Sequence, residues 1–126
     1  MSKSTFIIAE AGVNHNGESS TAFDLIDVAK ECGADAIKFQ LFLADKLVTQ
    51  YASKANYQLV DADSNLQLEM LKKLELTKET FKKIKEYCKA KSIEFMCTAF
   101  DKDNLNFFLE KLDTNILKIA SGELTN

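Results

Sequence analysis

Polar side chains that suit anion binding and proton transfer stand at or just after the ends of four short apolar runs in this sequence. They are Glu10, Lys38, Gln40, Thr98, Lys118, Ser121 and Glu123. Lysine ammonium groups and hydroxyls bind phosphate and carboxylate groups, and glutamates transfer protons. These residue types therefore predict a site for a phosphorylated or carboxylated small molecule.

The two lysines of this set carry most of the prediction. Side chains alternate between the two faces of a strand, so Lys38 and Gln40 share one face and Phe39 lies on the other. An ammonium group that points into a protein is costly unless an anion or a carboxylate partners it. Glu10 and Glu123 are candidate partners. A structural ion-pair cluster is therefore one interpretation, and the anion site, which the pattern favours, is the other.

The segment 10–17 holds the only histidine and two of the four glycines, directly after an apolar run. This composition predicts a loop with tight backbone turns between a strand and a helix. His15 has three interpretations: a proton-transfer group, a metal ligand or a hydrogen-bonding residue of the loop. Its spacing favours the last of these, a structural role.

Strand-like and helix-like segments alternate along the chain, and their order decides where the polar residues lie. The predicted strands are 5–9, 35–41, 93–97 and 115–120, and the predicted helices are 19–32, 66–74, 78–91 and one that follows Asp101. Thr77 and Asp101 are predicted N-caps, and Gly33 is a predicted C-cap. The alternation predicts an α/β fold with a parallel sheet, in which functional sites lie at the carboxyl ends of the strands.

Residues 42–64 form a polar stretch that is long for a connection, which indicates a functional loop.

The three cysteines form no C-x-x-C pair. We expect Cys32, Cys88 and Cys97 to be free thiols. Cys32 and Cys88 stand near the ends of predicted helices, and we expect both to pack in the core.

Composition sets the broad class. The chain has 126 residues, enough for one domain, with 16 basic and 19 acidic residues and a net charge of −3. A slightly acidic chain disfavours a nucleic-acid partner, since phosphate contacts need excess basic charge. No apolar run reaches the length of a membrane span or a signal peptide, which predicts a cytoplasmic protein with no membrane partner.

Four motifs, each at a predicted strand end, resemble the bacterial sialic acid synthase family, which includes N-acetylneuraminate, legionaminate and pseudaminate synthases. They are Glu-Ala-Gly-Val-Asn-His-Asn-Gly at 10–17, Ile-Lys-Phe-Gln at 37–40, Cys-Thr-Ala-Phe-Asp at 97–101 and Lys-Ile-Ala-Ser-Gly-Glu at 118–123. The resemblance implies a TIM (β/α)₈ barrel. It also implies a condensation of phosphoenolpyruvate with an N-acetylated amino sugar, such as N-acetylmannosamine, to give a nine-carbon 2-keto sugar acid and phosphate. A divalent metal, Mn²⁺ or Mg²⁺, is implied as the cofactor of the complete enzyme.

The resemblance also implies a role for each candidate site residue. The phosphate and carboxylate of phosphoenolpyruvate would be held by four residues, Lys38, Thr98, Lys118 and Ser121. Gln40 would contact the sugar, and Glu10 and Glu123 would be the catalytic acid–base residues. Asn14 and His15 would shape the first loop, and Tyr57 in the 42–64 loop would reach the sugar.

Against the family pattern, residues 1–126 correspond to the N-terminal half of the barrel, with four parallel strands and intervening helices. The second half, with the two metal-ligating histidines, and the antifreeze-like domain would be absent, and we expect the isolated chain to be inactive. Open strand edges predict that such a chain dimerises, aggregates or belongs to a longer polypeptide; we favour the last, and expect a homo-oligomer. The alternative function is a non-catalytic half barrel that binds a phosphorylated metabolite or a partner chain.

Overall fold

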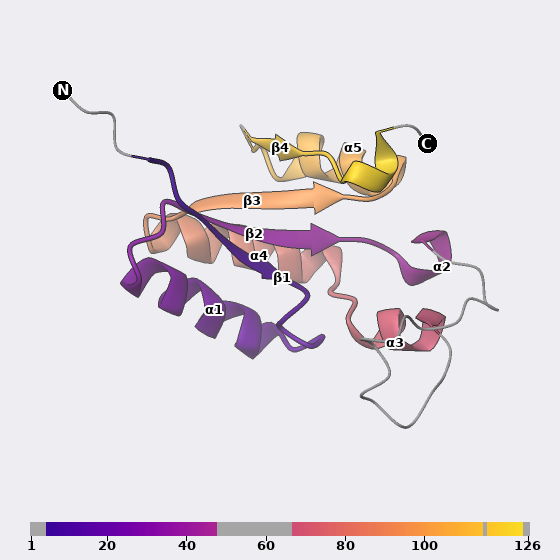
Figure 1. Cartoon of the computed structure of the whole chain (residues 1–126), viewed down its shortest axis with the longest axis horizontal. Coiled ribbons are helices and arrows are strands. Elements are labelled where there is room, and N and C mark those ends of the chain that lie inside the picture. Colours follow the sequence, from indigo (N-terminus) through magenta and orange to yellow (C-terminus); the bar gives the residue numbers. More distant parts are fainter. Residues whose placement is uncertain (1–4, 48–66, 115, 125–126) are drawn as a thin grey trace.

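The computed structural model describes residues 5–47, 67–114 and 116–124, in which four parallel strands alternate with helices (Figure 1). The strands are β1 (Ile8–Gly12), β2 (Ala36–Leu41), β3 (Glu94–Ala99) and β4 (Leu117–Lys118). The helices are α1 (Ser19–Glu31), α2 (Ala44–Leu47), α3 (Gln67–Lys73), α4 (Lys78–Ala90) and α5 (Lys102–Lys111), followed by a short 3₁₀ helix, η2 (Ser121–Glu123). The sheet order is β1-β2-β3-β4, so the predicted α/β alternation and parallel sheet are confirmed.

All four strands point the same way, and α2 and α3 lie beyond the carboxyl ends of the strands (Figure 1). The short helix α2 falls within the stretch that was predicted to be irregular, and most of that stretch, including Tyr57, lies outside the described residues. Within the described residues, the longest helices have 13 residues, and no helix combines the length and the apolar character that crossing a bilayer requires.

The predicted bounds of β1 and β4 are wrong, and β3 runs over Glu94–Ala99 in place of 93–97. β1 covers Ile8–Gly12 in place of 5–9, because the backbone of Glu10 continues the ladder opposite Lys38 while its side chain lies on one face of the sheet. The strand therefore continues through Glu10, before which the prediction ends it. β4 is shorter than predicted, since only Leu117 and Lys118 pair with β3.

The two predicted N-caps are confirmed, and the predicted C-cap glycine directly follows the C-cap residue of α1, which is Cys32. Thr77 Oγ1 accepts a hydrogen bond from the Thr80 N–H at 3.1 Å at the start of α4. Gly33, just after α1, has a φ of +80°, a conformation that favours glycine. Asp101 Oδ1 accepts from the N–H groups of Asp103 and Asn104, both at 3.0 Å, at the start of α5.

Helices cover one face of the sheet and form the core with it. Phe39 and Phe95 from adjacent strands stack with ring centroids 6.2 Å apart, and Phe108 of α5 packs against Phe95. Cys88 is buried in this core as predicted, and burial raises the pKa of its thiol to about 12. Cys32 is exposed, because it caps the end of α1 beyond the packed face, so the prediction that it packs in the core is wrong.

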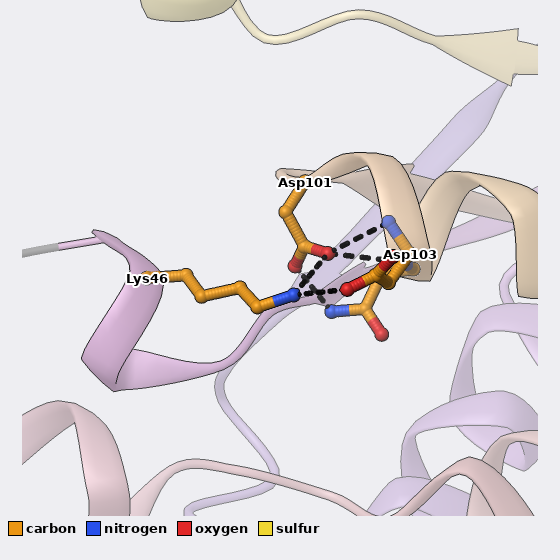
Figure 2. Close-up of polar contacts among 4 residues, drawn as sticks. Lys46, Asp101 and Asp103 are labelled. Carbon is orange, nitrogen blue, oxygen red and sulfur yellow. Dashed lines mark hydrogen bonds and ion pairs between the residues drawn. The ribbon is translucent and has the colours of Figure 1, made fainter.

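An ion-pair cluster ties the loop after β2 to the start of α5 (Figure 2). Lys46 Nζ of α2 donates to Asp103 Oδ2 at 2.6 Å and to Asp101 Oδ1 at 3.2 Å. These contacts raise the pKa of Lys46 and lower the pKa of Asp103. Asp101 also accepts from Asn104 Nδ2 at 2.6 Å. Asp101 therefore caps α5 and anchors the loop that follows the neighbouring strand.

Asp101→Ala should lower the free energy of unfolding by about 1–2 kcal/mol, because it removes the N-cap of α5. Urea denaturation followed by circular dichroism measures the change. Asp101→Asn keeps an oxygen that caps the helix and should retain most of the stability. Asp103→Ala removes an exposed Lys46 contact without touching the cap and should have a smaller effect. Equal losses in Asp101→Ala and Asp103→Ala would contradict the capping role.

Candidate functional site

The sheet register places the predicted polar residues in adjacent rows on the face opposite the helices. Glu10 of β1 pairs with Lys38 of β2. Two residues further along, Gln40 of β2 pairs with Thr98 of β3, and Thr98 pairs with Lys118 of β4. We call this face, which carries Glu10, Lys38, Gln40, Thr98 and Lys118, the inner face. Its polar residues lie toward the carboxyl ends of the strands, where parallel α/β folds place their sites.

Lys38 and Glu10 form an ion pair on the inner face. Lys38 Nζ contacts Glu10 Oε2, and the two side chains are 13% and 51% exposed. The attraction offsets the cost of placing the lysine in a largely buried position. The structural ion-pair interpretation therefore describes this pair, while the half-exposed Glu10 carboxylate still faces solvent on one side.

Lys118 has a different environment at the edge of the sheet. Its side chain is exposed, and its Nζ donates to the carbonyl oxygen of Ile119 at 2.6 Å. A carbonyl carries no full charge to offset the ammonium group. An anion that binds Lys118 therefore competes only with this carbonyl oxygen, whereas an anion that binds Lys38 competes with the Glu10 carboxylate.

Lys118 and Glu123 line a shared cavity of about 290 Å³. The cavity lies between the segment that follows β3, with Ala99 and Phe100, and the end of β4. Ser121 begins η2 beside it and is exposed. Glu10 belongs to the opposite edge strand, so the structure brings Glu123 close to Lys118 and brings Glu10 close to Lys38, but places the two glutamates at opposite edges of the sheet.

Gly12 makes room for two of these side chains. Its φ is +53°, and the β1–β2 register shifts between Glu10 and Gly12, which marks a bulge. A Cβ atom at Gly12 would lie 3.2 Å from Glu10 Oε1 and 3.6 Å from Gln40 Nε2. Sequence reasoning placed this glycine in a loop and missed its role inside the strand, for which the Glu-Ala-Gly motif was the available signal.

His15 is buried under the loop that follows β1. Its Nδ1 accepts from the Gly17 N–H at 3.0 Å, and its ring stacks on Phe39 with centroids 6.3 Å apart. An accepting Nδ1 assigns the ring proton to Nε2, which is buried and has no hydrogen-bond partner among the described residues. Burial lowers the pKa of His15, which keeps the ring neutral. These contacts agree with the structural role favoured for this residue.

A metal centre does not fit the described residues. In residues 5–47, 67–114 and 116–124, no three His, Cys, Asp or Glu side chains gather in a way that could hold an ion. Cys97 of β3 is buried in the core with Phe39, and burial raises the pKa of its thiol, which disfavours the thiolate that binds metals. No step of the chemistry below is therefore assigned to a metal held by these residues.

Four parallel strands in the order β1-β2-β3-β4, with helices on one face and polar side chains at the carboxyl ends on the other, define the first half of a TIM (β/α)₈ barrel. A solved structure of N-acetylneuraminic acid synthetase from Leptospira borgpetersenii superposes with a TM-score of 0.78 at 35% identity, over 98% of this chain and 39% of that one. The spore coat polysaccharide biosynthesis protein SpsE of Bacillus subtilis superposes with a TM-score of 0.68 at 34% identity, over 96% and 30%.

The chain belongs to the NeuB family, whose sequence profile matches residues 25–126. It is 50% identical to the N,N'-diacetyllegionaminic acid synthase of Legionella pneumophila, over 99% of this chain and 35% of that protein. It is 31% identical to the human N-acetylneuraminate-9-phosphate synthase, over 96% and 33%. The chain therefore spans about a third of the length of these relatives, and the resemblance inferred from the four motifs is confirmed.

The folded chain should lose stability as the pH falls below about 6.5. The pKa of His15 lies below its ordinary value of 6.5 in the folded state, so the unfolded chain takes up a proton that the folded chain resists. The loss can reach about 1.4 kcal/mol per pH unit for one group and is absent above pH 6.5. Urea midpoints measured between pH 5 and 8 test this expectation.

His15→Asn is the matched control, since the Asn oxygen can accept from the Gly17 N–H but does not titrate. The variant should be less stable than the wild type at pH 8 and should show a flatter dependence between pH 5.5 and 7. An identical pH dependence in both proteins would show that His15 is not the titrating group.

Proposed function

We propose that this chain supplies the phosphoenolpyruvate-binding part of a sialic acid synthase-type barrel. The reaction proposed for the whole barrel condenses phosphoenolpyruvate with an N-acetylated amino sugar, such as N-acetylmannosamine, to give a nine-carbon 2-keto sugar acid and phosphate. The observation that supports it most is the row of Gln40, Thr98 and Lys118 across three adjacent strands. Membership of a family that includes legionaminic acid and neuraminate synthases supports the same proposal.

Lys118 and Thr98 are proposed to bind the anionic groups of phosphoenolpyruvate. The Lys118 ammonium group is exposed to an arriving ligand, and the Thr98 side chain is only 3% exposed on the neighbouring strand. The lysine supplies a positive charge and the threonine hydroxyl supplies a directional hydrogen bond. Together they favour binding of a planar carboxylate or a tetrahedral phosphate group. Ser121 adds a second hydroxyl at the mouth of this position, and Gln40 lies on the side where the sugar would approach.

Lys38 is proposed to serve two partners in turn. In the structure it neutralises Glu10, so a ligand with several negative charges does not meet an unpaired carboxylate there. A bound phosphate or carboxylate would share the ammonium group with Glu10 and weaken the ion pair. The Glu10 carboxylate would then be released from the ion pair and could exchange a proton with the substrate.

The proposed chemistry needs one proton transfer near the sugar aldehyde and one near the attacking water. The methylene carbon of phosphoenolpyruvate forms a bond to the aldehyde carbon, whose oxygen takes up a proton. Water adds to the neighbouring carbon and loses a proton. The C–O bond to phosphate then breaks while the new hydroxyl becomes the ketone carbonyl, and its proton passes to the leaving phosphate. Glu10 and Glu123 are the proposed proton carriers. A divalent metal, Mn²⁺ or Mg²⁺, is proposed to polarise the aldehyde, with ligands outside the described residues, and the cytoplasm is the proposed location.

Phosphoenolpyruvate titrated into the chain by calorimetry should bind, and Lys118→Ala should weaken binding at least tenfold, because a hydrogen bond from a charged group is worth about 1.5–3 kcal/mol. Thr98→Val keeps the shape of the side chain, removes the hydroxyl and should weaken binding by a smaller factor. Circular dichroism checks that each variant is folded.

Lys83→Ala is the matched control, since it removes one exposed lysine from the outer helix α4 and changes the net charge by the same amount. It should leave the affinity unchanged. A loss of affinity as large as that of Lys118→Ala would indicate a general charge effect. A folded wild-type chain that does not bind phosphoenolpyruvate would contradict the proposal that this half of the barrel holds a preformed site.

A further inference from the structure

The cavity that Lys118 lines carries positive and negative side chains in balance. Among its described lining residues, Asp101 and Lys102 come from the start of α5, Lys118 comes from β4, and Glu123 comes from η2. The formal charges of these four side chains sum to zero. An anion that binds Lys118 therefore enters a space with two carboxylates in its walls, and its affinity depends on how those carboxylates are neutralised.

Asp101 is a carboxylate that water screens poorly. Its side chain is 13% exposed, whereas the side chain of Asp103, which lies outside the described lining of the cavity, is 72% exposed. Asp101 Oδ1 accepts from two backbone N–H groups at the start of α5. Such N–H groups carry only partial positive charges, so they offset the negative charge of the carboxylate in part.

Lys46 supplies the full positive charge that the backbone does not (Figure 2). Its Nζ lies 3.2 Å from Asp101 Oδ1 and 2.6 Å from Asp103 Oδ2. No second lysine forms an ion pair with Asp101 in the part of the chain that the structure describes. Lys46 belongs to α2 and is not among the described residues that line the cavity, so it affects an anion there through Asp101 and not by contact.

We propose that Lys46 is a positioning residue of the anion site, which raises the affinity of the cavity for an anion at Lys118 by neutralising Asp101. The inference rests on the function proposed above in one respect, since it takes Lys118 as the residue that binds the anion. It does not depend on which anion is bound. The ion pair that anchors the loop after β2 thereby also sets the charge of the site.

A purely structural role of Lys46 leads to a different expectation. An ion pair that only ties α2 to α5 would add little to stability, because both Lys46 and Asp103 are in contact with water. Its loss would leave the charge of the cavity without consequence for binding. Repulsion by an unpaired Asp101 carboxylate, in contrast, depends on the salt concentration and disappears when that carboxylate is removed.

Inorganic phosphate, titrated at constant ionic strength while the backbone amide signals of Lys118 and Thr98 are followed by NMR, tests the inference. Lys46→Met keeps the length of the side chain and removes its charge. We expect it to weaken phosphate binding by about two- to fivefold, because one carboxylate then repels the anion across the cavity. The difference from the wild type should shrink when potassium chloride is added, since salt screens the repulsion.

A second variant separates the charge effect from the anchoring effect. Asp101→Asn keeps an oxygen that caps α5 and removes the charge, so Lys46→Met combined with Asp101→Asn should bind phosphate nearly as tightly as the wild type. The tie between α2 and α5 stays broken in that double variant. Lys72→Met is the matched control, because it removes the same charge and breaks the 3.0 Å ion pair with Asp45 on the same helix α2. It should leave the affinity unchanged.

Equal phosphate affinities of the wild type and Lys46→Met would overturn the inference. A loss in the double variant as large as in Lys46→Met, or an equal loss in Lys72→Met, would overturn it as well. So would a wild-type chain whose Lys118 and Thr98 signals do not respond to phosphate, since Lys46 would then have no anion to favour. Phosphoenolpyruvate titrated in the same way keeps the two proposals apart. A Lys46 effect on phosphate in a chain that does not bind phosphoenolpyruvate would contradict the proposed function and still support the role of Lys46.

Discussion

The rest of the structure depends on the in-register parallel pairing of β2 with β3. Six residue pairs, from Ala36 opposite Glu94 to Leu41 opposite Ala99, fix which side chains share a face. The pairing turns Phe39 and Phe95 toward the helices and turns Gln40 and Thr98 the other way. A shift of one residue in either strand would exchange core and site, because side chains alternate along a strand. Burial of the aromatic face therefore holds the site residues in place.

The inner face solves the problem of buried charge in two different ways. Lys38 lies in the middle of the sheet, where water is scarce, and pairs with Glu10. Lys118 lies at the edge, where water and an arriving ligand can reach it. Position in the sheet thus separates a lysine that is neutralised within the protein from one that is available to an anion. The structural ion-pair interpretation describes Lys38, whereas the anion-site interpretation stays a prediction for Lys118.

Local chemistry made much of the fold predictable. Thr77, Asp101 and Gly33 act on hydrogen bonds within a few residues, so their types and positions were sufficient. The bounds of β1, the bulge at Gly12 and the contact between Lys46 and Asp101 depend on neighbours far along the chain, which one sequence does not show. The candidate site was predictable only in part. The alternation of side chains along a strand predicted that Lys38 and Gln40 share a face, whereas the separation of Glu10 from Glu123 follows only from the strand order.

Strand order also links closure of the barrel to the geometry of catalysis. In an eight-stranded ring made by one chain, β1 and β4 lie nearly opposite each other, so Glu10 and Lys118 would face each other across the interior. A substrate pair would then have to bridge the width of the barrel. The strands that complete the ring therefore decide which side chains come to lie beside Glu10 and which beside Lys118.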